Sequence, residues 1–578
     1  MSPFQLVTPC LRDNRWAILL GVCCLVAVDF MQLWIPRVVK WAVDDLTTAV
    51  GPVPLGGYAA QIVALAVGIG VFRYVWRRCL IGTSRKVERD LRWRLLDHLQ
   101  KLEPAYFDRH ATGELMAHAT NDINHVRMAT GMGMVALTDA VVLGTAAIGF
   151  MLYIDVRLTL LVLLPMPMIV VGTRLFSRQM HRRYQRVQAA FATLTETVRE
   201  HFSGIRVVKA YTMEFQAAAR IEAASGAYVA GNLSLVRITG AFFPMMMLFS
   251  NLSLALVLFL GGRATAAGAI TAGDFVAFIS YIGLITWPMM ALGWVMNLIQ
   301  RGKASLERLA AIFNTAPTIA DGPETLPLRG PVGRITFDGV TMAYDGRATA
   351  LEKIHLDLEN GRAYGIVGPP GGGKTSLVRL IGRLYEPTEG TMRIDAIPLA
   401  RIRLADLRRQ IAYVPQEPFI FAGTLGDNIT LGEATAPERL ASVLKDAALD
   451  RMVADLPDGL ETVVGERGIM LSGGQKQRVS LARALLSDRP ILLLDDPISQ
   501  LDTVTGRRVI KALRRRAAGR LMVIVSHRMA AVEWVDRIVV LENGRVTAQG
   551  TPAEVQSRSD YYRSACRLQA LEDNGRAD

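Results

Sequence analysis

Two patterns of hydrophobic residues divide the chain near residue 300. Before this point, apolar runs recur that are long enough to cross a bilayer, for which a helix needs about 20 residues. Beyond it, short β-rich segments such as AYGIV, ILLLD and LMVIVS alternate with helical stretches. That alternation is typical of an α/β nucleotide-binding domain. The sequence therefore predicts a polytopic α-helical membrane domain fused to an α/β domain.

Six apolar runs have the length of a transmembrane helix. They lie near residues 17–36, 59–80, 131–153, 158–177, 240–261 and 275–299. Some contain Pro or Gly, which membrane helices tolerate because neighbouring helices satisfy the freed backbone groups. The stretch that follows them is rich in Pro and Gly and lacks apolar periodicity, as a linker does. We expect a membrane domain over 1–315, a linker over 316–333 and a nucleotide-binding domain over 334–578.

Basic residues are concentrated in the two long connections between spans, at about 81–130 and 178–239. Because cytoplasmic loops carry an excess of Lys and Arg, both connections, the N-terminus and the C-terminal half are expected in the cytosol. The net charge of +13 is then a signal of membrane topology and not of nucleic-acid binding. Few helix breakers interrupt either connection, so each is predicted to be a helix out, a turn and a helix back. The turns are expected near 110–122 and 201–214.

The motif GPPGGGKTS at 368–376 stands between a strand-like and a helix-like segment, which is the context of a phosphate-binding P-loop. Its glycines let backbone N–H groups turn toward phosphate oxygens: Gly368, Gly371, Gly372 and Gly373. Lys374 supplies a positive charge to the β- and γ-phosphates, and Thr375 offers its hydroxyl to Mg²⁺. With Ser376, this loop is expected to bind ATP.

Two adjacent carboxylates, Asp495 and Asp496, follow the apolar segment ILLL. At the end of a buried strand, Asp495 can hold Mg²⁺ through water. Between the P-loop and this pair lies LSGGQKQR, residues 471–478. LSGGQ in this order resembles the signature of ATP-binding cassette (ABC) ATPases.

Further motifs resemble the same family and carry the roles that it implies. Tyr344 in MAYDG matches the aromatic residue that stacks on adenine, and Gln416 in YVPQEP matches the glutamine that senses Mg²⁺. His527 in IVSHR matches the switch histidine near the γ-phosphate, and Asp502 ends the D-loop match SQLD. VVGERG, 463–468, resembles the exporter-type loop that contacts the partner's coupling helix.

With six spans before these motifs, the chain resembles a type IV (exporter-fold) ABC half-transporter over nearly its whole length. In that family two ATPase domains pair head to tail, and each ATP lies between one chain's P-loop and the other chain's signature. The resemblance implies that four signature residues bind ATP held by a partner: Ser472, Gly473, Gly474 and Gln475. The stretches FDRHATGELMAHATNDI and ERGIMLSGGQKQR further resemble the bacterial multidrug resistance-like half-transporters of the MdlA type. This implies a multi-pass protein of the bacterial cytoplasmic (inner) membrane.

The family's usual residue after the strand-end aspartate is glutamate, which polarises the attacking water, but this chain has Asp496. A general base must come within about 2.6–3.2 Å of its proton, and a misplacement near 1 Å can cost on the order of a hundredfold. We expect the site on this chain's P-loop to be slow or inert, while its intact signature completes the active site of a partner. The chain is then one half of a heterodimer. The alternative is a homodimer in which Asp496 works adequately, directly or through a water.

The cargo is less well specified. Asp29 and Asp139 are acids within spans, each costing about 2.5–3.5 kcal/mol on insertion scales, so each should face a cavity or a partner. They either bind a cationic cargo or are hydrogen-bonded structural acids. Met and aromatic residues in FFPMMMLFSN and ITWPMMALGW suit either a promiscuous apolar pocket or simple packing. We expect export or flipping of amphipathic, lipid-like or drug-like molecules. Uptake of iron-chelating compounds and a regulatory ATPase that moves nothing are the alternatives.

Overall fold

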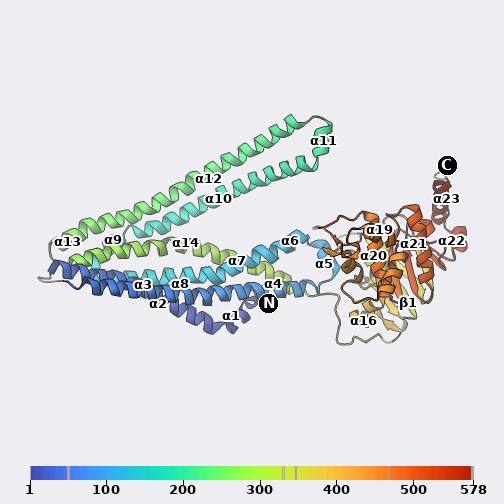
Figure 1. Ribbon diagram of the computed structural model, residues 1–578, viewed down its shortest axis with the longest axis horizontal. Helices are drawn as coiled ribbons and strands as arrows, with labels where there is room; N and C mark the ends of the chain where they lie inside the picture. Colours follow the sequence, from blue (N-terminus) through green and yellow to red (C-terminus); the bar gives the residue numbers. More distant parts are fainter. Residues whose placement is uncertain are drawn as a thin grey trace. The chain divides into compact units, whose positions relative to one another are not determined.

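The computed structural model describes residues 2–48, 53–328, 330, 332–344, 348–465 and 468–574 (Figure 1). The chain forms two compact units. The first comprises Met1–Gln100 and Thr112–Thr315, and the second comprises Lys101–Ala111 and Ala316–Asp578. The first is helical and the second is an α/β unit, so the predicted fold class is confirmed.

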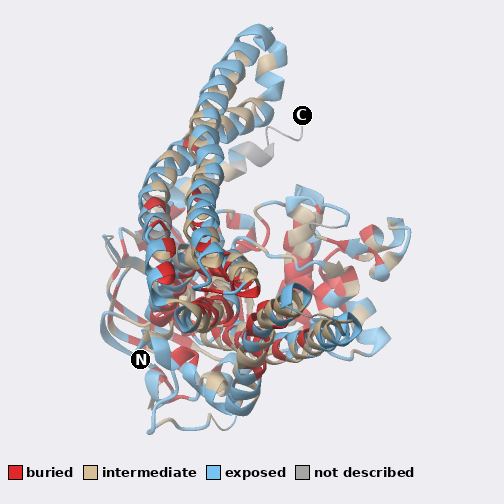
Figure 2. Cartoon of the chain, turned by 90° about the vertical axis from the view of Figure 1, so that its left-hand side faces the viewer, coloured by how far each residue is buried: buried red, intermediate tan, exposed pale blue. Residues whose placement is uncertain are grey.

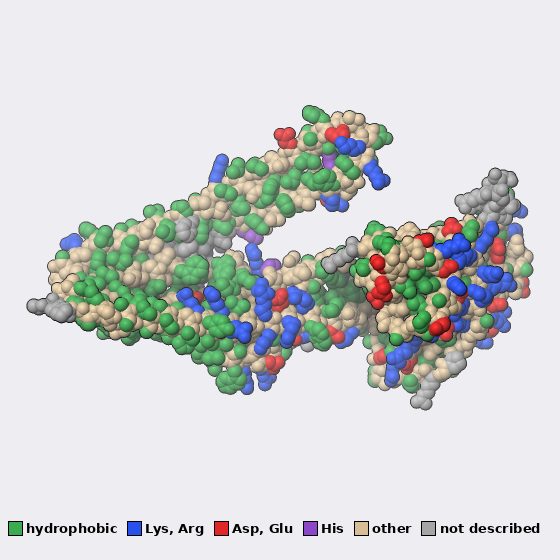
Figure 3. Space-filling view, viewed as in Figure 1, with side chains coloured by type: hydrophobic (Ala, Val, Ile, Leu, Met, Phe, Trp, Pro, Cys, Tyr) green, Lys and Arg blue, Asp and Glu red, His purple; other side chains and the backbone are tan. Residues whose placement is uncertain are grey.

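The first unit is built from long helices joined by short turns. Its elements are the 3₁₀ helix Pro3–Leu6, α1 (Thr8–Asp13), α2 (Arg15–Thr48), α3 (Leu55–Trp76), α4 (Gly82–Leu99), α6 (Thr112–Ala117), α7 (Ile123–Met128), α8 (Met134–Ile154), α9 (Val156–Leu163), α10 (Met166–Ser203), α11 (Ile205–Ala210), α12 (Glu214–Leu256), α13 (Gly262–Ala266) and α14 (Ala272–Asn314). π-helical segments continue the helices at Arg77–Ile81, His118–Asp122, Ala129–Gly133 and Val257–Gly261. Figure 3 shows hydrophobic side chains along this unit and Lys and Arg gathered over the part near α4 and α7.

Five helical stretches among the described residues are long and apolar enough to cross a membrane. They are Arg15–Thr48, Leu55–Leu99, Thr112–Ile154, Glu214–Ala266 and Ala272–Asn314. Each contains one predicted span. The remaining predicted span, 158–177, crosses the end of α9, a turn at Leu164–Pro165 and the start of α10. Pro165 lacks the N–H that would continue the helix, so this segment is not one uninterrupted helix.

The second long connection has the predicted form. α10 ends at Ser203, α11 forms the tip, and α12 begins at Glu214. The two long helices run side by side (Figure 1), and Figure 2 shows that this arm is largely exposed toward its tip.

The first turn was predicted near 110–122, and this is wrong. The chain turns over 100–111, around the short helix α5 (Pro104–Arg109), and α6 already begins at Thr112. The physical reason is Pro104, which disfavours helix for the residue before it. Glu103 accordingly is extended, with φ −72° and ψ 158°.

The second unit contains two main sheets. The strands of the antiparallel sheet, in spatial order, are β2 (Thr349–Glu359), β1 (Arg334–Ala343), β4 (Glu389–Ile394) and β5 (Ile397–Pro398). Those of the mixed sheet are β12 (Arg545–Gly550), β11 (Arg537–Glu542), β3 (Ala363–Val367), β10 (Leu521–Val525), β9 (Ile491–Asp495) and β6 (Ile411–Val414). β7 (Gly423–Thr424) pairs with β8 (Val463–Val464).

The helices of the second unit are α15 (Lys374–Ile381), α16 (Leu404–Arg409), α17 (Leu425–Thr430), α18 (Pro437–Asp446), α19 (Asp450–Asp455), α20 (Gly473–Ser487), α21 (Thr503–Arg516), α22 (Pro552–Arg558) and α23 (Asp560–Asn574). Of these, α15, α16, α20 and α22 pack against strands of the mixed sheet. β3, β9 and β10 are buried at every position, as expected of parallel strands covered on both faces. Their carboxyl ends meet at one edge of the sheet, where α/β folds bind ligands.

Candidate nucleotide-binding site

The P-loop leaves β3 and enters α15 through backbone that only glycine can follow. Gly373 has φ +95°, and a Cβ there would lie 2.4 Å from the carbonyl oxygen of Ala350. Gly368 has φ +154°, and its Cβ would lie 1.9 Å from the carbonyl oxygen of Leu541. Backbone atoms of the neighbouring strands β2 and β11 therefore leave no room for a side chain at these two positions of the loop.

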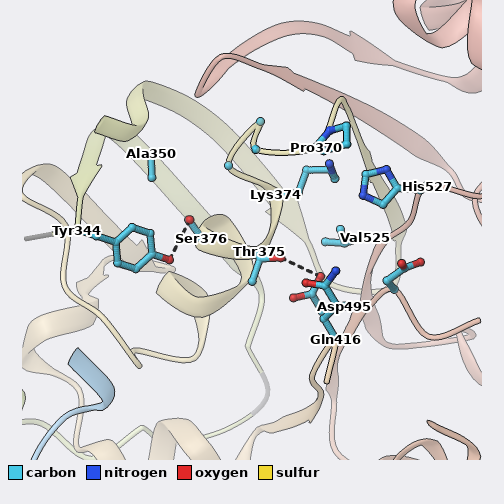
Figure 4. Close-up of a pocket in the computed structure, with 14 residues that line it drawn as sticks. Tyr344, Ala350, Pro370, Lys374, Thr375, Ser376, Gln416, Asp495, Val525 and His527 are labelled. Atoms are coloured by element: carbon cyan, nitrogen blue, oxygen red, sulfur yellow. Dashed lines mark hydrogen bonds between the residues drawn. The ribbon is translucent and has the colours of Figure 1, made fainter. Parts of the chain in front are cut away.

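This loop borders a cavity of about 340 Å³ (Figure 4). The cavity gathers residues that lie far apart in the sequence. Its lining consists of Tyr344, Ala350, Pro370, Gly371, Gly372, Gly373, Lys374, Thr375, Ser376, Gln416, Asp495, Asp496, Val525 and His527. The structure thus brings together the P-loop, the strand-end carboxylates and the single residues predicted around them.

Lys374 points into the glycine loop and is buried. Its ammonium donates to the carbonyl oxygens of Gly368 and Pro369, both at 2.8 Å. Burial lowers the pKa of Lys374, while the charges of Asp495 and Asp496 act in the opposite direction. The ammonium is therefore held where phosphate oxygens can replace the two carbonyls as acceptors.

Thr375 and Asp495 face each other across the cavity floor. The Thr375 hydroxyl donates to Oδ1 of Asp495 at 3.2 Å (Figure 4), and burial raises the pKa of this carboxyl. Within the described residues, Oδ2 of Asp495 is buried without a hydrogen-bond partner. A hydroxyl beside an unpartnered carboxylate oxygen fits Mg²⁺, which takes few protein ligands and keeps its water and phosphate oxygens.

Asp496 is held by its backbone on several sides. It adopts φ +55°, its N–H donates to the carbonyl oxygen of Val525 at 2.8 Å, and its own carbonyl accepts from Gln477 Nε2 at 2.6 Å. The Ser526 hydroxyl donates to Oδ1 of Asp496 at 3.4 Å. These hydrogen bonds fix the position of the Asp496 backbone.

Tyr344 closes the other end of the cavity. Its hydroxyl lies 3.0 Å from that of Ser376 (Figure 4), and its ring packs edge-on against Tyr385 with centroids 5.2 Å apart. The Tyr385 hydroxyl in turn donates to a carboxylate oxygen of Asp108 on α5. Burial and this bond raise the pKa of Tyr385. Asp345 and Gly346 of the MAYDG motif lie outside the described residues.

His527 and Gln416 complete the wall near the P-loop and the strand-end carboxylates. His527 follows β10 by two residues, and Gln416 follows β6 by two. Desolvation and the charge of Lys374 lower the pKa of His527, which favours the neutral imidazole. A neutral imidazole can donate to a phosphate oxygen through one ring nitrogen.

The signature residues are not among those that line this cavity. Ser472 caps α20: its hydroxyl accepts from the Gln475 N–H at 3.3 Å, and its own N–H donates to Gln475 Oε1 at 2.7 Å. A Cβ on Gly473 or Gly474 would clash with atoms of Gln500. The signature therefore presents small residues and a helix N-terminus, which favours an anion.

Asp502 also lies away from the cavity lining and caps α21, accepting from the Thr505 N–H at 2.9 Å. Hydrogen bonds from Thr505 lower the pKa of Asp502. In VVGERG, Val463 and Val464 form β8, whereas Glu466 and Arg467 lie outside the described residues.

Sequence reasoning missed Gln477, which links these parts. It is fully buried on α20, and its amide donates to the Asp496 carbonyl and to Ser499 Oγ at 3.1 Å. Its Oε1 accepts from the Gln500 N–H at 3.1 Å. Gln477 is the second glutamine in GGQKQR, and a polar residue at a core position of the helix could have pointed to a buried role. Its hydrogen-bond partners, however, lie about 20 residues away along the chain.

Two protein families match the sequence. The ABC transporter transmembrane region matches residues 18–289, and the ABC transporter family, which is the ATPase part, matches residues 351–499. The chain is also similar to the multidrug resistance-like ATP-binding protein MdlA of Escherichia coli, with 36% identity over 97% of this chain and 95% of that protein.

Another relative is the probable multidrug resistance ABC transporter ATP-binding/permease protein YheI of Bacillus subtilis. It is 32% identical over 96% of this chain and 95% of its own length. Among solved structures, a bacterial Atm1-family ABC exporter with ATP bound matches with a TM-score of 0.78 and 26% identity. The match covers 98% of this chain and 99% of that one. The similarity thus extends over both units.

Proposed function

The chain belongs to the ABC transporter family, as an exporter-fold half-transporter that joins a membrane unit to an ATPase, and on that premise we propose that it is the catalytically weak half of a heterodimeric exporter. As an ABC ATPase it binds ATP and couples hydrolysis to transport across a membrane. As a half-transporter it requires a second ABC half.

The observation that carries the proposal is Asp496. An aspartate stands where the family has glutamate, and its backbone is fixed by Val525 and Gln477. The carboxylate therefore falls about one methylene short of the water that it would have to polarise. Since a base works only within about 2.6–3.2 Å of its proton, the site on this P-loop binds ATP and Mg²⁺ but turns over slowly.

The signature supports the other half of the proposal. Ser472, Gly473 and Gly474 keep the small side chains at a helix N-terminus that a γ-phosphate needs. These residues complete an active site on a partner that supplies its own P-loop and glutamate. ATP then holds the two ATPase units together, and hydrolysis at the partner's P-loop releases them.

The cargo is proposed to be an amphipathic or drug-like molecule exported across the bacterial cytoplasmic membrane. Support comes from the long apolar helices and from relatives that are named for multidrug resistance. The concentration of Lys and Arg near α4 and α7 (Figure 3) supports a topology with the N-terminus and the ATPase in the cytosol.

The test is to purify the chain alone and together with a second half-transporter, and to measure ATP hydrolysis by both. We expect slow hydrolysis by the chain alone and fast hydrolysis by the pair. Fast, cooperative turnover by the chain alone would replace the heterodimer with a homodimer. Inside-out vesicles that accumulate a fluorescent amphipath when ATP is added outside would establish export, whereas accumulation only by right-side-out vesicles would indicate uptake.

A further inference from the structure

The C-terminal helix α23 holds the main chain of the short segment that carries His527. This segment leaves β10 after Val525 and enters a 3₁₀ helix, Met529–Ala531. Gln569 on α23 makes two hydrogen bonds to it. Its Oε1 accepts from the Met529 N–H at 2.6 Å, and its Nε2 donates to the His527 carbonyl oxygen at 2.7 Å. The two bonds lie on either side of one residue, so they fix the direction of the main chain beside the imidazole.

A carboxamide matches what this segment needs. The Met529 N–H stands at the start of the 3₁₀ helix, where N–H groups have no partner within the helix. Because Met529 is 1% exposed, an unpaired N–H there would be costly. The His527 carbonyl needs a donor instead. One planar amide offers both a donor and an acceptor, so Gln569 satisfies the two groups together.

α23 is anchored in the apolar core of the second unit. Tyr562 is 2% exposed and belongs to the same hydrophobic cluster as Met529, and Cys566 packs against this cluster. Cys566 follows Tyr562 by four residues, and Gln569 follows Cys566 by three, so the three share one face of the helix. Gln569 therefore contacts the His527 segment from a helix that the core holds in place.

The side chain of Arg528 attaches the same segment to the D-loop match SQLD. Its guanidinium donates to the carbonyl oxygens of Leu501 at 2.8 Å and of Ser499 at 3.1 Å. The imidazole of His527 lies in the cavity wall (Figure 4), where the charge of Lys374 acts on it. A shift of this segment would therefore move the imidazole at the phosphate end of the cavity.

We propose that Gln569 is a positioning residue of the nucleotide site: it holds His527 against the γ-phosphate and so makes this P-loop site prefer ATP to ADP. None of the described residues of α23 is among those that line the cavity, so the helix acts through His527. The inference rests on the proposed ATP site of this chain. It does not depend on the heterodimer or on the strength of Asp496 as a base.

The test compares two nucleotides on the full chain in Mg²⁺: the β,γ-imido analogue of ATP, which is not hydrolysed, and ADP. Each displaces a fluorescent ADP analogue. Gln569→Met removes both hydrogen bonds and keeps an unbranched side chain that favours helix. It should weaken binding of the ATP analogue about fivefold or more and change ADP affinity less than about twofold, because ADP has no γ-phosphate for His527 to contact.

A second substitution tests whether Gln569 acts through His527. His527→Ala should itself reduce the preference for the ATP analogue, and Gln569→Met should cause no further loss in the His527→Ala background. The matched control is Leu568→Ala on the same helix, where the side chain is 62% exposed. It should leave both affinities unchanged. If Gln569→Met fails to fold, Gln569→Asn, whose amide is one methylene shorter, is measured with the same two nucleotides.

Equal weakening of both nucleotides would show that Gln569 only stabilises the unit, and the proposal would be wrong. Unchanged affinities in Gln569→Met, or an undiminished loss in the His527→Ala background, would also overturn it. If the wild type binds neither nucleotide, the proposed ATP site is rejected and this inference with it. Fast ATP hydrolysis by the wild-type chain alone would reject the heterodimer but leave the role of Gln569 in place.

Discussion

The P-loop side and the signature side of the ATPase unit differ in how many of the family's usual residues they keep. The P-loop side has glycines at positive φ in the loop and a lysine and threonine that line a formed cavity, and it ends in Asp496, which is one methylene shorter than the family's glutamate. The signature side has its serine cap and both glycines. On the proposal that Asp496 is too short to act as the base, one side binds nucleotide without an adequate base, and the other completes a site on another chain. The polypeptide would then contribute unequally to two ATP sites.

The largest loss of ATP turnover is expected from a substitution in the partner chain. In the assembled pair, changing the glutamate after the partner's strand-end aspartate to glutamine should lower ATP turnover by about a hundredfold or more, because that residue would be the working base. Steady-state phosphate release measures the effect. A loss of only two- to threefold would mean that both sites hydrolyse ATP, which would contradict the proposed difference between them.

The second-largest loss of ATP turnover is expected from a change in the signature of this chain. Ser472→Ala should lower turnover of the pair roughly ten- to hundredfold, since it removes a hydrogen bond to a charged phosphate. The matched control is Ser487→Ala at the other end of α20, where the hydroxyl donates to the Ala484 carbonyl at 2.8 Å. If both variants behave alike, Ser472 acts through helix stability and not through a nucleotide.

The P-loop should still bind nucleotide. Gly373→Ala should weaken ATP binding to the isolated chain about tenfold, because the new Cβ would lie 2.4 Å from the Ala350 carbonyl oxygen and φ is +95°. Gly382→Ala is the control, as its Cβ would meet nothing closer than 3.6 Å. Equilibrium binding of a fluorescent ATP analogue compares the two. Equal affinities would show that the backbone conformation at Gly373 does not control nucleotide binding in the isolated chain.

The smallest expected change in ATP turnover best distinguishes a pair with one working base from a pair with two. In the assembled pair, Asp496→Asn should change turnover by less than about twofold, because a base that is already out of reach contributes little. The same phosphate-release assay applies. A loss comparable to that from the partner's glutamate would place working bases in both sites.

Much of the second unit could be predicted because short, continuous stretches of sequence specify its strands and its P-loop. β3, β9 and β10 are continuous apolar runs, and the P-loop motif itself specifies a strand, a glycine turn and a helix. The predicted residues among those that line the cavity stand in the loop or shortly after a strand, as Tyr344, Gln416 and His527 do. What could not be predicted depends on contacts across the fold. The bond from Gln477 that fixes the Asp496 carbonyl joins segments that no local pattern relates.

The membrane unit was less predictable. Apolar length located the spans but not the break at Pro165. The first turn was predicted about ten residues late, because Pro104 ends the preceding helical stretch before 110–122. Apolar composition alone also says little about which face of a membrane helix meets its neighbours. The packing of α2 against α3 and α8 therefore emerges only from the folded structure.

The most direct measurement is phosphate release by this chain purified without a partner, in Mg²⁺ and ATP, for the wild type and two variants. Slow release that Asp496→Asn leaves unchanged and that Asp496→Glu raises about tenfold or more would establish that the missing methylene limits the chemistry. Fast release by the wild type that Asp496→Asn abolishes would contradict it.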